Sequence, residues 1–263
     1  MAVSLSLEGK VALITGGSRG IGAETVRLFA EAGARVAFNY RMARAQADAL
    51  AAECGKPQRC LAIGQELSTT KDGHALVEAA VRAFGRLDIL VANHGIWESK
   101  DVPVDEMTEA QWRRTLGVNL DSVFGLVQAA AAQMLRQPVP SGEVSRGHIV
   151  LISSTAGQRG EAYHADYAVT KGALISLTKS LSSELAPKGI RVNCVAPGWV
   201  ATEMSAEALK DTKLGSQIRQ GIPVGRVAAP REIAGPVLFL CTPLAGFISG
   251  EVMNVNGGSV LAG

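Results

Sequence analysis

The stretch KVALITGGSRGIG, residues 10–22, decides the fold that we predict for this chain. Its apolar first half is typical of a buried strand, and the glycines that follow end the strand in a tight turn. Apolar residues then recur at helical spacing, which predicts a helix over 21–32. A glycine-rich turn lets the backbone approach a pyrophosphate, which the positive N-terminus of the helix attracts. We therefore predict a dinucleotide site at this turn.

The same alternation of apolar strand and amphipathic helix continues to the end of the chain. It predicts a parallel sheet that helices cover on both faces. Taken with right-handed crossovers, it indicates an α/β fold: one doubly wound domain over 1–263 with a seven-stranded parallel sheet. Residues 137–144 and 203–225 are loop-rich, and the second segment is long enough for a substrate lid. The strands are predicted at 10–15, 35–39, 59–63, 87–92, 148–153, 191–196 and 251–254, and the helices at 21–32, 41–52, 69–84, 108–134, 163–186 and 231–241.

The composition narrows the class of protein. Apolar residues make up 47% and charged residues 19% of 263 residues, which suits a globular core and argues against disorder. A net charge of +2 is too small to indicate a nucleic-acid or membrane partner. The four cysteines and four histidines lack metal-ligand spacing, so no metal site is expected. Neither a leader pattern nor an apolar run of membrane-spanning length is present, which predicts a cytoplasmic protein.

A candidate reactive pair lies in the predicted helix over 163–186. Tyr167 and Lys171 are four residues apart, so their side chains share one helix face. An ammonium beside a phenol favours the phenolate and lowers the pKa of the tyrosine. The pair is thus expected to give or take a proton near neutral pH.

Further motifs accompany this pair in a fixed order along the chain: the Thr-Gly-x-x-x-Gly-x-Gly turn at 15–22, Ala92-Asn-His-Gly95, Asn119, Ser154 thirteen residues before Tyr167, Lys171, Pro197-Gly198 with Thr202, and Asn256-Gly-Gly258. Taken together, these motifs resemble the short-chain dehydrogenase/reductase family along nearly the whole chain. The resemblance implies a Rossmann-type fold and reduction of a ketone to a secondary alcohol with a nicotinamide cofactor, and it is strongest to 3-oxoacyl-(acyl-carrier-protein) reductases.

The resemblance assigns catalytic roles to four residues. It implies that Tyr167 donates the proton to the substrate oxygen and that Ser154 positions that oxygen. Lys171 is then expected to lower the pKa of Tyr167 and to hold the nicotinamide ribose. Asn119 is expected to hold a water that supplies protons, the alternative being an ordinary helix residue.

The substrate pocket is expected to contain Ser154, Tyr167, His164 and Trp199. Trp199 is either a pocket wall or a packing residue, and His164 either turns toward the substrate or does not. The weaker candidates for this pocket are Trp97, Gln158, Met204 and Leu209.

The cofactor site follows from the same resemblance, with two departures from the family pattern. His94 replaces an alanine and is either structural or within reach of the substrate; we favour the structural role. Glu66 replaces an aspartate and either meets the adenine or faces water. The full expected set is Gly16, Ser18, Arg19, Gly20, Ile21, Gly22, Asn39, Tyr40, Arg41, Glu66, Leu67, Asn93, Gly95, Tyr167, Lys171, Pro197, Gly198, Val200 and Thr202.

The end of the second predicted strand indicates which dinucleotide binds. An enzyme that uses NAD places a carboxylate there to accept from the ribose 2′-hydroxyl, whereas this chain has Asn39. Arg19 and Arg41 are instead available for a 2′-phosphate, unless both simply face water. We therefore expect NADP(H) to be preferred over NAD(H).

Several partners and alternatives remain open at this stage. An acyl-carrier protein is acidic, and Lys188 and Arg146 are expected to form a basic surface near the mouth of the site. Sugar, steroid or xenobiotic ketones and alcohols are alternative substrates, because fold does not define substrate. A non-catalytic nucleotide sensor is the alternative outside the enzymes. Family members of this length are usually homotetramers, and pairing of the helices near 108–134 and 163–186 is expected here.

Overall fold

The centre of this computed structural model is a parallel sheet of seven strands within the described residues 5–55, 58–139, 143 and 145–261. The strand order is β3-β2-β1-β4-β5-β6-β7, so the order reverses between β1 and β4. This confirms the predicted doubly wound α/β fold. The strands are β1 Val11–Ile14, β2 Arg35–Tyr40, β3 Cys60–Gly64, β4 Ile89–Ala92, β5 Gly147–Ile152, β6 Ile190–Pro197 and β7 Val252–Val255.

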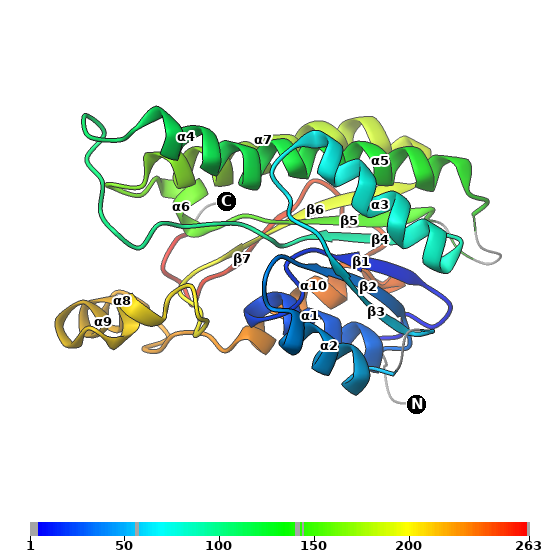
Figure 1. The fold of residues 1–263 in the computed structure, drawn as a ribbon, viewed down its shortest axis with the longest axis horizontal. Helices are drawn as coiled ribbons and strands as arrows, with labels where there is room; N and C mark the ends of the chain where they lie inside the picture. Colours follow the sequence, from blue (N-terminus) through cyan, green and yellow to red (C-terminus); the bar gives the residue numbers. More distant parts are fainter. Residues whose placement is uncertain (1–4, 56–57, 140–142, 144, 262–263) are drawn as a thin grey trace.

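Helices cover both faces of the sheet (Figure 1). One face carries α1 Gly20–Glu31, α2 Arg44–Glu53 and α10 Pro230–Leu240, and the other carries α3 Thr70–Phe84, α4 Glu109–Leu116, α5 Ser122–Arg136 and α7 Ala165–Leu185. Among the described helices, none combines the length and apolarity that crossing a membrane requires. The remaining helices are α6 Thr155–Arg159, α8 Ala206–Lys210 and α9 Thr212–Gln220, with short turns at Gly117–Asp121, Ala186–Lys188 and Pro243–Ala245.

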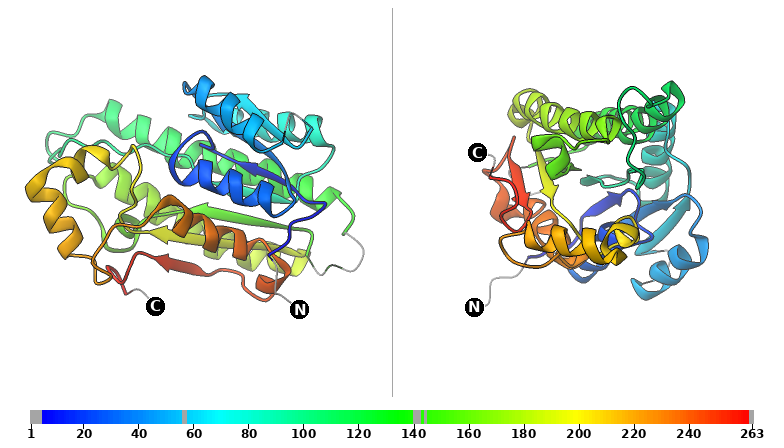
Figure 2. Two further views of the ribbon diagram at one scale, coloured as in Figure 1. Left: turned by 90° about the horizontal axis from the view of Figure 1, so that it is seen from below. Right: turned by 90° about the vertical axis from the view of Figure 1, so that its left-hand side faces the viewer.

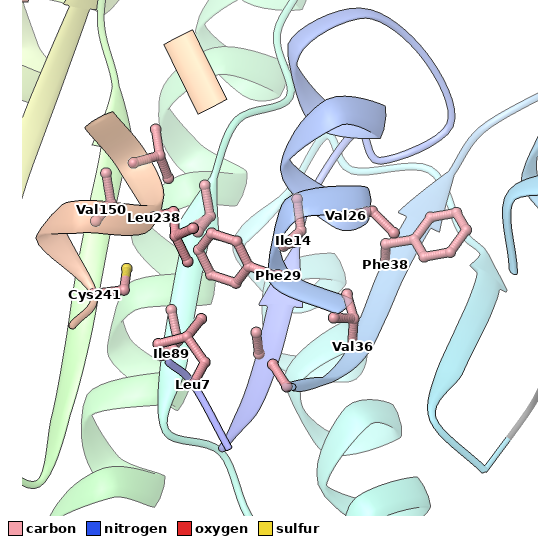
Figure 3. Packing of buried hydrophobic residues seen from close by; sticks show 14 of the residues in the cluster. Leu7, Ile14, Val26, Phe29, Val36, Phe38, Ile89, Val150, Leu238 and Cys241 are labelled. Carbon is pink, nitrogen blue, oxygen red and sulfur yellow. The ribbon is translucent and has the colours of Figure 1, made fainter. Parts of the chain in front are cut away.

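Two apolar cores, one on each side of the sheet, hold these layers together. In the core under α1 and α10, Phe29 points between Ile14, Ile89 and Leu238 (Figure 3). Phe29 is fully buried, as are the side chains of β1. Because parallel strands are covered on both faces, both sets of alternating side chains must be apolar. This explains the continuous apolar run of β1.

The helix predicted over 108–134 is interrupted, which corrects the sequence-based prediction. After α4 ends at Leu116, one π-helical turn, Gly117–Asp121, leads into α5. A π turn inserts an extra residue and frees a backbone carbonyl from its usual partner. Apolar periodicity runs through such a turn almost unchanged, so the sequence did not reveal it.

The segment 203–225 is largely helical, whereas the sequence indicated a loop. It contains α8 and α9, and the Asp211 side chain caps α9 by accepting from the Leu214 amide at 2.6 Å. Ala208, Ile218 and Ile222 of this segment form a small buried cluster. These helices project from one end of the sheet (Figures 1 and 2). They are too short for their periodicity to be recognised in the sequence.

Three smaller corrections concern helix boundaries near the site. The helix α6 was not predicted at all, and α2 begins at Arg44 rather than at residue 41. The helix predicted from residue 163 begins at Ala165, because Tyr163 has a left-handed backbone, with φ of 65°, that no helix accepts.

The close contact between α3 and α5 predicts that a methyl group added at Gly125 strongly lowers the stability of the protein. A Cβ at Gly125 would lie 2.1 Å from the Thr70 carbonyl oxygen, which is fixed backbone. We expect Gly125→Ala to destabilise the protein by about 2 kcal/mol or more, since overpacking forces the helices apart. Denaturant unfolding followed by circular dichroism measures this change.

Gly235 in the middle of α10 is the matched control, because a Cβ there meets no atom within 4 Å. Gly235→Ala should leave the free energy of unfolding unchanged or raise it by about 0.5 kcal/mol. Equal effects of the two substitutions would contradict the packing argument.

Candidate active site

A cavity of about 560 Å³ opens where the strand order reverses, at the carboxyl ends of the strands. Ligands of doubly wound sheets bind in this crevice. The structure brings together in its wall these residues expected from sequence: Gly16, Ser18, Arg19, Gly20, Ile21, Asn39, Tyr40, Arg41, Glu66, Leu67, Asn93, Gly95, Ser154, Tyr167, Lys171, Pro197, Gly198, Trp199, Val200 and Thr202, with the weaker candidates Trp97 and Met204. Gly22, Asn119, His164, Gln158 and Leu209 are not in the wall.

The glycine turn between β1 and α1 has the shape that a pyrophosphate requires. Gly16 and Gly20 have φ of 64° and 55°, and a Cβ at Gly22 would lie 2.1 Å from the Gly16 carbonyl oxygen. No side chain caps α1, and its first turn has no acidic residue. The free N–H groups and the helix dipole therefore face the cavity unopposed, which fits the phosphates of a dinucleotide.

Two asparagine side chains, a buried one at Asn39 and a partly buried one at Asn93, hold this turn in place. The Asn39 side chain accepts from the Gly16 amide at 2.8 Å and donates to the Gln65 carbonyl at 2.9 Å. The Asn93 side chain donates to the Thr15 carbonyl at 2.9 Å. The sequence indicated that both residues contact the cofactor; the structure adds that their side chains brace the backbone.

The adenosine end of the cavity carries two arginines in different surroundings. Arg41 lies 3.6 Å from Glu66, and the side chains are 54% and 61% exposed. Arg19 is exposed and forms no ion pair with the described residues. An exposed ion pair is weak, so a guanidinium in such a pair can leave its carboxylate for a stronger anionic partner. Both guanidiniums can therefore turn to an anion, although Glu66 competes for Arg41.

His94 connects the end of β4 to the π turn. Its Nε2 lies 3.0 Å from the Val118 carbonyl oxygen and donates to it, so Nδ1 accepts from the Thr15 hydroxyl at 2.7 Å. Burial, together with the charge of Lys171, lowers the pKa of His94 to about 3. His94 also lines the cavity, but a neutral ring with both nitrogens bonded to the protein supports the structural role that we favoured.

Tyr167, Lys171 and Ser154 converge on the same part of the cavity. Burial raises the pKa of Tyr167 to about 12; the hydrogen bond with Ser154 opposes this shift and the charge of Glu161 adds to it. The Ser154 hydroxyl also accepts from the Ala156 amide at 3.1 Å, which caps α6.

The expectation that Lys171 lowers the pKa of Tyr167 is not met. The Lys171 amino group lies 5.7 Å from the centre of the phenol ring and donates to the Ile152 carbonyl at 2.8 Å. Burial lowers the pKa of Lys171 to about 8. Desolvation therefore dominates both groups and keeps the phenol protonated at neutral pH.

Asn119 lies in the π turn behind the cavity. Its side chain accepts from the Ile96 amide at 2.8 Å, and it donates to the Ile96 carbonyl at 2.9 Å and to the Thr170 hydroxyl at 3.2 Å. These bonds tie the loop after β4 to α7, one residue before Lys171. Asn119 thus positions the catalytic helix, and its expected role in holding a water stays a prediction.

Aromatic side chains form the substrate end. Trp97 and Trp199 meet edge to face with ring centres 6.1 Å apart, and both contact the apolar cluster of α8 and α9. Trp199 is therefore both a wall and a packing residue. His164 is buried behind Trp97, with ring centres 5.0 Å apart, and lies 3.5 Å from Asp101. The structure does not bring His164 to the cavity.

The basic surface expected at the mouth is not there, which is a correction. Arg146 and Lys188 precede β5 and β6, at their amino ends, whereas the cavity opens at the carboxyl ends. Arg146 donates to the Gln137 carbonyl at 2.6 Å, and Lys188 pairs with Glu184 at 3.5 Å. The two residues therefore lie at the amino ends of these strands, whereas Ser154 follows the carboxyl end of β5.

Sequence reasoning missed three charged residues in the wall: Glu203 after β6, Arg159 at the end of α6 and Glu161 just after α6. For Arg159 and Glu161, their position between Ser154 and Tyr167 was a signal that they lie near the site. Without α6 in the prediction, however, nothing indicated which way they point.

Comparisons with known proteins agree with this geometry. A family model described as enoyl-(acyl carrier protein) reductase matches residues 16–259. The 3-oxoacyl-(acyl-carrier-protein) reductase FabG of Vibrio cholerae is 39% identical, over 97% of this chain and 98% of that protein.

Two crystal structures from Brucella melitensis match with a TM-score of 0.88 each. One is a short-chain dehydrogenase/reductase titled glucose/ribitol dehydrogenase, 36% identical over 99% of this chain and 100% of the other. The second is a 3-ketoacyl-(acyl-carrier-protein) reductase complexed with NADH, 34% identical over 97% and 100%. The chain belongs to the short-chain dehydrogenase/reductase family and is an oxidoreductase of carbonyl and alcohol groups.

Proposed function

We propose that this protein reduces a ketone, a 3-oxoacyl compound or a similar carbonyl, to a secondary alcohol and prefers NADPH as the hydride donor. The observation that supports this most is the convergence of Ser154, Tyr167 and Lys171 on one cavity with an uncapped, glycine-rich helix N-terminus. When bound, the nicotinamide supplies the hydride. The 3-oxoacyl substrate is favoured by the name of the Vibrio cholerae relative.

Each catalytic side chain has a task that follows from its environment. Ser154 and Tyr167 donate hydrogen bonds to the carbonyl oxygen, where negative charge develops during reduction. With a pKa near 12, Tyr167 is protonated at neutral pH, which suits an acid that gives its proton to that oxygen. Lys171, whose pKa is about 8, is mostly charged at neutral pH and can hold ribose hydroxyls and return the proton.

The alternatives from the sequence are less well supported. A sensor without activity would have no use for a tyrosine, a serine and a buried lysine that converge on one cavity. Sugar, steroid and xenobiotic substrates are alternatives that use the same chemistry, and the Brucella melitensis structure titled glucose/ribitol dehydrogenase is named for sugar substrates. We further propose that the protein works in the cytoplasm, and that 203–225 acts as a lid over the substrate.

A homotetramer also stays a proposal. Phe124 of α5 and Val169 of α7 expose 47% and 49% of their surface, and Phe247 is wholly exposed. A second copy would cover these apolar side chains at no cost in hydrogen bonding.

The first prediction concerns the acid. Tyr167→Phe should reduce kcat for NADPH-dependent ketone reduction by a factor of about 1,000 or more, because the proton donor is lost while the ring remains. Fluorescence titration should show NADPH binding within a few-fold of wild type. Tyr163→Phe, an exposed tyrosine outside the cavity wall, is the matched control and should retain full activity. Undiminished turnover by Tyr167→Phe would refute the proposed mechanism.

The second prediction concerns the cofactor. Wild type should have a lower KM for NADPH than for NADH, and Arg19→Ala should raise the KM for NADPH about tenfold to a hundredfold, the cost of one charge-assisted bond. The KM for NADH should change little. Steady-state kinetics with both cofactors measures this, and a clear preference of wild type for NADH would contradict the proposal.

The ion pair between Arg41 and Glu66 predicts that a substitution of Glu66 strengthens the preference for NADPH, whereas Arg19→Ala weakens it. Glu66→Gln releases Arg41 for the 2′-phosphate, so the preference for NADPH should increase a few-fold. Glu78→Gln, which breaks a comparable exposed pair with Arg82 on α3, is the control and should leave the KM ratio unchanged.

A further inference from the structure

Glu161 places a carboxylate in the cavity wall without a partner. Its side chain forms no hydrogen bond or ion pair with any residue that the structure describes, although it lines the cavity and is partly buried. Burial raises the pKa of this carboxyl group, and the nearby charges of His164 and Arg159 only partly oppose the shift. A desolvated acceptor without a donor is costly unless a ligand supplies one.

Arg159 supplies the complementary half of the arrangement. It ends α6, lines the same cavity and likewise forms no hydrogen bond or ion pair with the described residues. It attracts Glu161 electrostatically, yet the two side chains do not approach within the 4.0 Å of an ion pair. The wall therefore presents a free acceptor and a free donor side by side.

The backbone that carries Glu161 is held in a strained conformation. Tyr163 has φ of 65°, which is uncommon for a residue with a side chain, and its carbonyl accepts from the Val102 amide at 3.2 Å. The His164 amide donates to the Glu161 carbonyl at 3.3 Å, and the His164 ring is buried behind Trp97. Strain of this kind persists where the surroundings enforce it, and it is concentrated at functional sites.

Glu161 lines the same cavity as Tyr167, the proposed acid. Its charge acts on the pKa of Tyr167, together with burial and the Ser154 hydroxyl. A substituent of the bound ketone can therefore reach Glu161 while Tyr167 protonates the carbonyl. The same cavity is lined by the edge-to-face pair Trp97 and Trp199, whose flat apolar surfaces suit the C–H faces of a compact or cyclic substrate.

We propose that Glu161 and Arg159 select a ketone that carries a hydroxyl group next to its carbonyl. A hydroxyl both donates and accepts, so it satisfies the carboxylate and the guanidinium together. A carboxylate substituent would be repelled by Glu161, and an ammonium substituent by Arg159. This inference rests on the proposed ketone reduction and narrows its substrate to hydroxylated carbonyl compounds, or the matching polyols in the reverse direction.

The test compares two ketones of equal size, 2-hydroxycyclohexanone and 2-methylcyclohexanone. Wild type should have a kcat/KM at least about tenfold higher for the hydroxylated ketone, because the methyl group covers the partly buried Glu161 carboxylate without giving it a hydrogen-bond donor. Glu161→Leu should reduce this ratio about tenfold, whereas Glu161→Gln, which keeps an acceptor, should retain most of it. Glu106→Leu, a control at an exposed glutamate outside the wall, should leave the ratio unchanged.

A pH profile separates this role from a purely structural one. Three groups face Tyr167: the Ser154 hydroxyl, the Lys171 ammonium and the Glu161 carboxylate. Because the carboxylate raises the pKa of Tyr167, Glu161→Gln should move the alkaline limb of the kcat profile for reduction to lower pH. A merely structural glutamate would leave that limb in place.

The outcomes distinguish this inference from the function on which it rests. If no ketone is reduced with NADPH or NADH, the proposed function fails and the inference with it. If both cyclohexanones are reduced with equal kcat/KM by wild type and by Glu161→Leu, the inference alone is overturned.

Discussion

The geometry of this site depends on a chain of hydrogen bonds, buried or partly buried, from the end of β1 to the second turn of α7. The Thr15 hydroxyl accepts from the Asn93 amide at 2.9 Å and bonds to His94, which donates to the Val118 carbonyl in the π turn. One residue later, Asn119 bonds to the Thr170 hydroxyl. Buried networks hold a unique geometry only when every member is satisfied. Here the network joins the dinucleotide turn to the helix that carries Tyr167 and Lys171.

The π turn between α4 and α5 explains how neighbouring residues bond both to His94 after β4 and to Thr170 in α7. In a regular α-helix the Val118 carbonyl would be committed to the amide four residues on, whereas here it also accepts from His94 and from the Ser122 hydroxyl. The same turn directs Asn119 toward the loop after β4. Gly95 in that loop lies close to both groups, because a Cβ added there would lie 3.3 Å from Asn119 Oδ1 and 3.4 Å from Lys171 Nζ. A side chain at this position would therefore be tightly packed between Asn119 and Lys171.

How far the sequence predicts this structure varies with the kind of feature. Long apolar strands such as β5 are fully buried, and their pattern predicts both their place and the parallel sheet. The four residues expected to be catalytic follow from motif spacing, because one turn or helix fixes the place of each. The short helices α6, α8 and α9 escape such reasoning, since one or two turns contain too few residues for a period. The misplaced Arg146 and Lys188 show that closeness in sequence to a catalytic strand does not say which end of that strand a residue occupies.

The features that the sequence could not predict are those that distinguish one substrate from another. A Cβ at Gly22 would meet the Gly16 carbonyl, the Asn39 side chain accepts from the Gly16 amide, and His94 bonds to Thr15 and the Val118 carbonyl, so replacing any of them disturbs the cofactor turn itself. Glu161 and Arg159 carry no such duty, because the loop around them is held by other groups: the Tyr163 carbonyl and the buried ring of His164. Their side chains can therefore change without loss of the fold. A scaffold built in this way keeps the chemistry of hydride transfer constant while two unpartnered charges determine which carbonyl compound is reduced.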